Sequence, residues 1–166
     1  GMLSTCAYMS ASTNQISGSW NLTVPIGQFS STTTSGTCPG SGFDRVKTYN
    51  PIDGPNYSSS PAPYPNVFGA PQFEADTCSN PTNNDTALWL ISNNLPPTTL
   101  ACNNDAWPVC NSLSPKLSRI GPVNLPTGTT QTSGTCRLNV YYKSSTLKVG
   151  QTSVTVDFSY YEPPPP

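Results

Sequence analysis

Carboxylates are the residues of this chain that could carry out acid–base chemistry, because the sequence contains no histidine. The chain therefore lacks the commonest general base and cannot assemble a Ser-His-Asp or Cys-His arrangement. Glu74 and Asp76 are two positions apart, so on a strand they would share a face, and paired carboxylates are what glycoside hydrolysis requires. Two acids at this spacing are also ordinary in a polar segment. We expect no catalytic residues and no enzymatic activity, with a hydrolase acting through this pair as the third alternative.

Six cysteines form a second group of reactive side chains. Zinc sites need ligands about two to four residues apart, usually with histidine, whereas even the closest pair here, Cys102 and Cys110, is further apart than that. We therefore expect disulfides and an extracellular or cell-surface location. Spacing leaves the connectivity open, except that a bridge between Cys102 and Cys110 would close a small local loop. The expected disulfide cysteines are Cys6, Cys38, Cys78, Cys102, Cys110 and Cys136.

Two oxygen-rich triplets, Asn83-Asn84-Asp85 and Asn103-Asn104-Asp105, are each followed within a few residues by a tryptophan, Trp89 or Trp107. Hard oxygen ligands suit Ca²⁺, and amides beside an exposed ring suit a sugar. The same triplets also form Asx turns without any ligand. No cofactor and no metal site is expected, with calcium kept as an alternative. The candidate ligand-binding residues are Asn103, Asn104, Asp105 and Trp107.

Three sequons, at Asn21, Asn56 and Asn84, could accept N-linked glycans, while Pro81 blocks a fourth at Asn80. A chain rich in Asn, Ser and Thr also produces sequons by chance. They predict a glycoprotein only where the source has the glycosylation machinery.

Charge and hydropathy exclude several partners. Charged residues make up 9% of the chain, compared with about 25% in typical soluble domains. The seven basic residues are scattered singly, so no cluster could neutralise several phosphates of a nucleic acid. No stretch approaches the roughly 18 apolar residues that span a bilayer. The expected partners are other extracellular proteins, copies of the chain itself, or glycans.

Strict alternation of apolar and polar residues predicts strands in two C-terminal segments, Cys136–Lys143 and 153–161, which we expect to pair with each other in antiparallel fashion. Residues 16–24 alternate as well, with Gly18 as the position of a bulge or close approach. The apolar run within 86–92 predicts a strand buried on both faces. Weaker strand candidates are residues 43–49 and 116–120, and residues 147–150 form a short strand or part of a wider connection.

These elements predict an all-β fold, a disulfide-braced antiparallel β-sandwich of immunoglobulin-like or jelly-roll-like type. Long Pro/Gly/Ser-rich segments, residues 50–72 and 93–114, read as irregular loops. Residues 1–162 are expected to form one domain, followed by a polyproline stub at 163–166 that begins a linker or stalk. The strand at 152–161 resembles the last strand of immunoglobulin-like and pilus-subunit sandwiches, a likeness that carries no functional residue.

The function expected from this sequence is that of an extracellular structural or adhesive module of a surface, matrix or filament-forming glycoprotein, acting through protein–protein contacts. Low charge, disulfides, abundant Ser and Thr, and a Pro-rich end favour it. The alternative is a lectin-like carbohydrate-binding domain, assisted by calcium.

Overall fold

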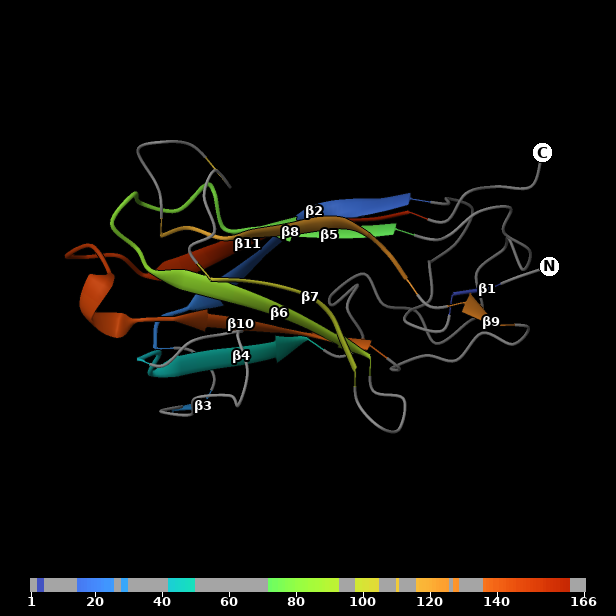
Figure 1. Ribbon diagram of the computed structural model, residues 1–166. Helices are drawn as coiled ribbons and strands as arrows, with labels where there is room; N and C mark the ends of the chain where they lie inside the picture. The colour runs from blue at the N-terminus through green and yellow to red at the C-terminus, as the bar shows by residue number, and fades with distance from the viewer. Residues whose placement is uncertain are drawn as a thin grey trace.

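Two antiparallel sheets face each other in the computed structural model of the protein, and the chain passes repeatedly from one sheet to the other (Figure 1). The structure describes residues 3–4, 15–25, 28–29, 42–49, 72–92, 98–104, 110, 116–125, 127–128 and 136–161. The part described is all-β apart from one turn of 3-10 helix, Ser144–Thr146. No helix in it is long and apolar enough to cross a bilayer.

The four-stranded sheet has the order β2 (Gln15–Thr23), β11 (Ser153–Tyr161), β5 (Gln72–Asp76), β8 (Arg119–Asn124). The five-stranded sheet has the order β3 (Gln28–Phe29), β4 (Arg45–Tyr49), β10 (Cys136–Tyr142), β6 (Thr86–Ser92), β7 (Thr98–Asn104). The two-residue strands β1 (Leu3–Ser4) and β9 (Thr127–Gly128) pair with each other.

The eight longer strands of the described residues pair from the outside of the sequence inward. The first of them, β2, pairs with the last, β11; β4 pairs with β10, β5 with β8, and β6 with β7. Consecutive strands mostly lie in opposite sheets as a result. The predicted pairing of the two C-terminal strands is therefore wrong. The connection after β10 carries the chain into the other sheet, where β11 lies between β2 and β5.

Alternating side chains from both sheets form the core. Leu138 and Val140 of β10 and Val154 and Val156 of β11 are completely buried, which confirms the predicted alternation of these strands, although Tyr141 on the outer side of β10 is buried as well. Trp20 of β2 is stacked between two other rings, with centroid distances of 4.0 Å to Tyr49 and 4.3 Å to Phe158. Because Tyr49 belongs to the five-stranded sheet, this stack ties β2 to the opposite layer.

Strand β6 is buried on both faces, as its apolar run predicts. Its second face contributes Ala87 to a smaller apolar cluster on the outer side of the five-stranded sheet, together with Phe43 and Tyr141. Trp89 packs partly buried against that cluster and donates its indole N–H to Thr99 Oγ1 at 2.9 Å. Burial raises the pKa of the Tyr141 hydroxyl, because the phenolate would lose its hydration there.

Two of the eight longer strands, β5 and β7, are not among the predicted strands, and neither are the two-residue strands β1, β3 and β9. Strand β7 lies within residues 93–114, where an irregular loop is predicted, and β5 holds Glu74 and Asp76. Residues 147–150 form no strand and belong instead to the connection between the sheets. Pairing continues through Gly18 without a register shift, so the expected bulge is absent at that position. The other irregular segment, 50–72, lies outside the described residues except for Gln72.

Strand β8 contains the position where glycine is required. Gly121 has φ of +90°, and a Cβ there would come within 2.5 Å of the carbonyl oxygen of Phe73. The register shifts at this point, so that Gly121 and Pro122 together face Glu74. Proline has no backbone N–H to donate, and it is tolerated here because the bulge interrupts the ladder.

Candidate functional site

The cysteines are cross-linked, but not as predicted. Cys78 and Cys110 form a disulfide, so the expected bridge between Cys102 and Cys110 is wrong. Sequence proximity misled the prediction, because a disulfide needs Cα atoms about 4.4–6.8 Å apart in space, and Cys78 meets that condition at 5.4 Å. Cys102 and Cys136 are disulfide-bonded as well. Cys6 and Cys38 lie outside the described residues.

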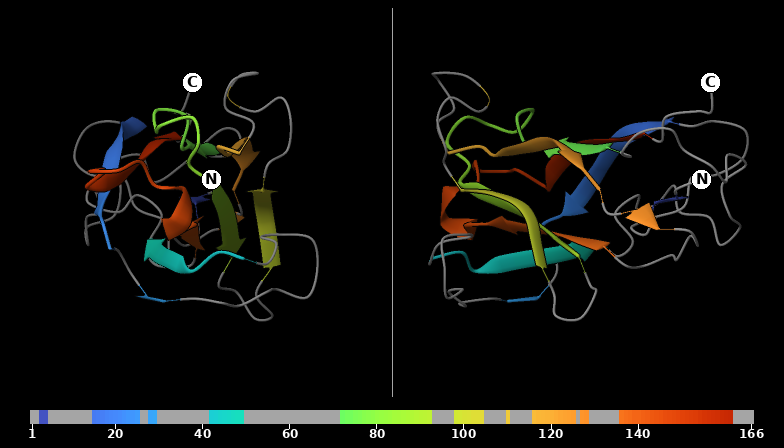
Figure 2. Two further views of the ribbon diagram at one scale, coloured as in Figure 1. Left: turned by 90° about the vertical axis from the view of Figure 1, so that its left-hand side faces the viewer. Right: turned by 45° about the vertical axis from the view of Figure 1, so that its right-hand side comes forward.

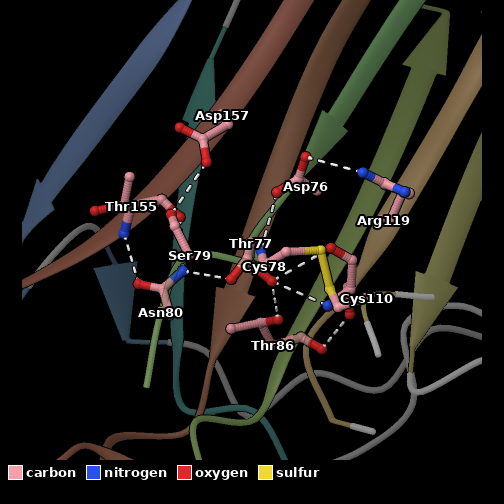
Figure 3. The surroundings of a disulfide bond; sticks show 11 residues. Asp76, Thr77, Cys78, Ser79, Asn80, Thr86, Cys110, Arg119, Thr155 and Asp157 are labelled. Atoms are coloured by element: carbon pink, nitrogen blue, oxygen red, sulfur yellow. Dashed lines mark hydrogen bonds and ion pairs between the residues drawn. A yellow bond between two sulfur atoms is a disulfide. The ribbon is translucent and has the colours of Figure 1, made fainter. Parts of the chain in front are cut away.

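The Cys78–Cys110 bridge attaches Cys110 to the loop between β5 and β6 (Figure 3). Beside it lies a buried hydroxyl network that joins the two sheets. Thr77 Oγ1 is 2.6 Å from Thr86 Oγ1 and accepts the Ser118 N–H at 2.9 Å, while Ser118 Oγ donates to the Thr86 carbonyl at 2.6 Å. All three residues are completely buried. Their hydroxyls satisfy backbone groups that water cannot reach.

Asn80 fixes the same loop to β11. Its side-chain N–H₂ donates to the carbonyls of Thr77 and Thr155, and its Oδ1 accepts the Thr155 N–H at 2.8 Å (Figure 3). The Asn80 side-chain amide therefore makes the two hydrogen bonds to Thr155 that a neighbouring backbone residue would otherwise make, just beyond the end of β5. This explains a buried asparagine that would otherwise suggest a ligand site.

The first oxygen-rich triplet is structural. Asn84 is completely buried, donates to the Thr146 carbonyl and exchanges two hydrogen bonds with the Gln151 amide. Asp85 is 3% exposed and forms an ion pair with Lys143, with Nζ 3.1 Å from Oδ2. Asn84 has no exposed surface in the folded chain, so we expect this sequon to remain without a glycan. Asn21 is exposed on the outer face of β2, and Asn56 lies outside the described residues.

The second triplet is only partly described. Asn103 and Asn104 are half-buried at the end of β7, an edge strand of the five-stranded sheet. The side-chain oxygen of Asn104 is buried and accepts no hydrogen bond in the part of the chain described. Asp105 and Trp107 lie outside that part. The structure therefore brings together two of the four candidate ligand-binding residues.

A depression of about 710 Å³ lies at the end of the sandwich that holds the 3-10 helix. Pro81, Thr82 and Asn83 line one side, and the connection between β10 and β11 lines the other with Ser145, Thr146, Leu147 and Lys148. Among the lining residues there is no carboxylate and no aromatic ring that could stack on a sugar. No local sequence pattern predicts this depression, because its two sides are far apart along the chain.

Three of the five described carboxylates lie on the outer face of the four-stranded sheet. Asp76 and Glu74 share that face, as their spacing predicts, and Asp157 of β11 lies directly opposite Asp76. Partial burial raises the pKa of the Asp76 carboxyl, and the charges of Asp157 and Glu74 act in the same direction. The Cys78 N–H and the Arg119 guanidinium, 3.8 Å away, oppose the rise without cancelling it.

The side chains on this face are paired sideways from strand to strand. Ser19 and Ser79 both donate to the Asp157 carboxylate, Thr155 donates to Asn21 at 2.9 Å, and Ser17 donates to Ser159 at 3.1 Å. Gln72 and Asn124 form a similar pair at 3.1 Å. Groups that satisfy one another in this way form a solvated surface. Their hydrogen-bonding capacity is used within the protein, so they do not by themselves indicate a ligand site.

Strand β2 is the least protected edge of the two sheets in the described part of the chain. At the other edges, β3 has two residues, β7 carries an extra residue at its register shift, and β8 carries a proline and a bulge. Strands β7 and β8 also lie against each other. Nine residues of β2 pair without interruption to β11, and the strand contains no charge and no proline. The left view of Figure 2 shows β2, in blue, at the side of its sheet.

The side chains of β2 alternate between the core and the outer face of the sheet. Trp20 and Leu22 point inward and are buried, whereas Ser17, Ser19 and Asn21 point outward and are exposed. Gly18 has the inward register of Trp20 and is nevertheless exposed. The edge is therefore accessible at the middle of the strand. The outer side of an edge strand is where another strand can be added to a sheet.

Comparison of the chain with protein-family models, with curated proteins and with solved structures finds no match in any of the three.

Proposed function

We propose that this protein is an extracellular structural or adhesive module that binds protein partners by strand addition at β2, an edge strand of the four-stranded sheet among the described residues. The observation that carries the proposal is the nine-residue edge without charge, proline or bulge. Proteins that avoid such pairing usually protect a long edge with one of these devices. Backbone hydrogen bonds would supply the affinity, and the side chains of β2 would supply the selectivity.

Compartment and fold support this role. The four described cysteines are all in disulfides, which persist outside the reducing cytoplasm, and charge is sparse throughout the chain. We propose further that the sandwich is of the jelly-roll type. The first of the longer strands pairs with the last, and the chain crosses repeatedly between the two sheets. A jelly roll has this arrangement, because it forms when one long antiparallel hairpin folds over into two sheets. No cofactor is part of the proposal.

A lysine introduced on the inner face of β2 tests the proposal. Gly18→Lys places a charge where an added strand would lie, and its aliphatic stem can cover Phe158, the partner of Gly18 in β11. Thr82→Lys adds the same charge on an exposed turn away from the edge and serves as the control. Beads carrying each protein are mixed with extracellular proteins of the organism that makes it. Capture by the original chain and by Thr82→Lys, with loss in Gly18→Lys, is expected; undiminished capture by a folded Gly18→Lys variant would refute the proposal.

Asn84 and Asp85 are bonded to other residues within the protein. The carbohydrate-binding alternative therefore depends on the second set of candidates, which is Asn103, Asn104, Asp105 and Trp107. A glycan array read with and without calcium, and repeated with Trp107→Ala, tests it. A sugar signal that disappears in the variant would favour this alternative.

A further inference from the structure

We infer that the depression beside the 3-10 helix is a binding site for an acidic sugar unit of an extracellular polysaccharide. Its polar lining consists of Thr82 and Asn83 on one wall and of Ser145 and Lys148, with the residues between them, on the other. The volume of about 710 Å³ lies within the range of about 300–1,000 Å³ that is typical of small-ligand sites. The site is separate from β2 and from the candidates at 103–107, so the inference goes beyond the proposed function.

The polar side chains at this depression differ from those on the outer face of the four-stranded sheet. On that face, hydroxyl and amide groups pair with one another across the strands. At the depression, no hydrogen bond joins the side chains of Thr82, Asn83, Ser145 or Lys148 to another described residue. Two hydroxyls, an amide and an ammonium group are therefore available to a ligand. The hydroxyl groups of a sugar can bind such side chains as donors and as acceptors.

Lys148 determines the charge of the ligand, because it is the one charged residue among the described residues that line the depression. Two carboxylates adjoin the walls, and each has a cation of its own. Asp85 is paired with Lys143 at 3.1 Å, and Asp44, which accepts the backbone N–H at position 144, lies 3.7 Å from Arg45. The positive charge of Lys148 is therefore not balanced in the described part of the chain, and a carboxylate of the ligand can form a charge-assisted hydrogen bond with it.

Buried hydrogen bonds fix the two walls relative to each other. Asn84, which follows Asn83, exchanges two hydrogen bonds with the Gln151 amide and donates to the Thr146 carbonyl. Gln151 Oε1 also accepts the Lys148 N–H at 2.9 Å, and the Gln151 N–H donates to the Lys148 carbonyl at 2.9 Å. The pair of Asn84 and Gln151 thus joins the turn that carries Asn83 to the turn that carries Lys148. A site that is fixed before binding loses little conformational entropy when the ligand arrives.

The lining favours a sugar over an acidic peptide. Arginine clusters, sheet edges and aromatic grooves are common means of binding peptides. The described lining contains one lysine, no arginine and no aromatic ring, and its residues belong to turns and the 3-10 helix rather than to a strand. A sugar acid carries hydroxyl groups around its ring beside the carboxylate, so it can use the lysine and the neutral polar side chains together.

Isothermal titration calorimetry of the full chain at low salt tests the charge requirement. The probes are tetramers of galacturonic acid and of mannuronic acid, each compared with its methyl ester, which keeps the hydroxyls and lacks the charge. The original chain should bind at least one acid more tightly than its ester. Lys148→Gln should remove this preference and weaken binding of the acid at least about fivefold, because the charge-assisted hydrogen bond is lost. Lys47→Gln removes the same charge from the middle of β4 and should change nothing.

Asn83→Ala tests the contact with the hydroxyl groups. It should weaken binding of the acid and of the ester by a similar factor and should keep the preference for the acid, because the amide serves the part that the two probes share. Asn83 is exposed and its side chain has no partner among the described residues, so its removal should leave the fold intact. Loss of the charge preference in one variant and its retention in the other is a pattern that a folding defect would not produce.

A tetramer of glutamic acid supplies the peptide comparison. Absence of binding to both uronic acid tetramers at millimolar concentration would overturn the inference, as would equal binding of acid and ester by the original chain. Binding of the glutamate tetramer as tight as that of the sugar acids would also overturn it, because the site would then recognise charge alone. Gly18→Lys alters β2 and should keep the sugar binding, so the outcome here is distinguishable from that of the proposed function.

Discussion

Asp157 of β11 lies directly opposite Asp76 of β5, so two carboxylates of like charge occupy neighbouring positions of one antiparallel pair. The structure compensates each differently. Asp157 accepts hydrogen bonds from Ser19 and Ser79, while Asp76 accepts the Cys78 N–H and lies near the Arg119 guanidinium. A direct carboxylate pair across strands is normally destabilising. Its cost should therefore appear in the dependence of stability on pH.

Asp76→Asn should make the folded protein less sensitive to pH. The pKa of Asp76 is raised above its ordinary value of 3.8 in the fold, chiefly by burial, so ionisation is less favourable in the folded than in the unfolded chain. The stability associated with its protonated form is complete below pH 3.8 and is lost as the pH rises through the folded pKa. Asparagine cannot ionise and keeps an oxygen for the Cys78 N–H.

Urea unfolding measured at a series of pH values checks this. The stability of Asp76→Asn relative to the original chain should increase from strongly acidic to near-neutral pH. The lost ion pair with Arg119 is half-exposed and should cost no more than about 1 kcal/mol at any pH. A relative stability that falls over the same range would contradict the assigned direction of the pKa shift.

Thr77→Val should destabilise the protein by about 1–3 kcal/mol, because it leaves the buried Ser118 N–H without its side-chain acceptor. Valine has the same shape, so packing of the buried site is retained. Thr23→Val is a matched control on an exposed strand position and should change stability by less than about 0.5 kcal/mol. Equal effects of the two substitutions in denaturant unfolding would show that the hydroxyl network contributes nothing.

Alternation in the sequence predicted strands but not their neighbours. Leu138, Val140, Val154 and Val156 mark the inner faces of β10 and β11, which pack into the core between the sheets. Alternation of apolar and polar residues shows which side of a strand is buried, but it does not show which other strand pairs with it. Pairing of first with last strands depends on long crossings between sheets, and the short sequence distance between β10 and β11 suggested the opposite.

Local sequence patterns also did not predict strands β5 and β7 or the different surroundings of the two oxygen-rich triplets. Strand β5 alternates strictly but is only five residues long and buries only Phe73 and Ala75, whereas β7 is an edge strand whose side chains are at most half-buried and show no apolar period. The triplets at Asn84 and Asn103 have the same sequence pattern but different surroundings. The first is enclosed by the connection between the sheets, a contact that no local pattern records.

Removal of the Cys78–Cys110 bridge by substituting both residues with serine should lower the free energy of unfolding by about 3–4 kcal/mol. The bridge joins residues 32 positions apart, and a cross-link over a loop of that length restricts the unfolded chain by about this amount. Guanidinium unfolding of the double variant, with the other disulfides confirmed by mass, measures the difference. A loss below about 1 kcal/mol would mean that the loop is held mainly by Asn80 and its hydrogen bonds.

Peptide mapping should show that Cys102 and Cys136 are not bonded to each other. Cys102 lies on β7 opposite Trp89, Cys136 lies on β10 opposite Ser92, and the two strands flank β6 on opposite sides. Two strand spacings alone separate them by about 10 Å, beyond the reach of a disulfide. Each is bonded, so we expect each to be found with Cys6 or Cys38, the two cysteines that remain. A peptide linking Cys102 with Cys136 would contradict the strand order.

Secretion from a host that attaches N-linked glycans should leave Asn84 unmodified in the folded product. Its amide nitrogen donates two hydrogen bonds inside the protein, and a glycan would replace one amide hydrogen in a site with no exposed surface. Asn21 is exposed, and its side-chain oxygen, rather than its nitrogen, is the atom bonded to Thr155, so a glycan can be attached while that bond remains. Glycopeptide mass spectrometry should therefore detect modification at Asn21 and none at Asn84. A folded fraction glycosylated at Asn84 would show that the corner between Asn84 and Gln151 is not closed as described, because the reciprocal amide pair could not form there.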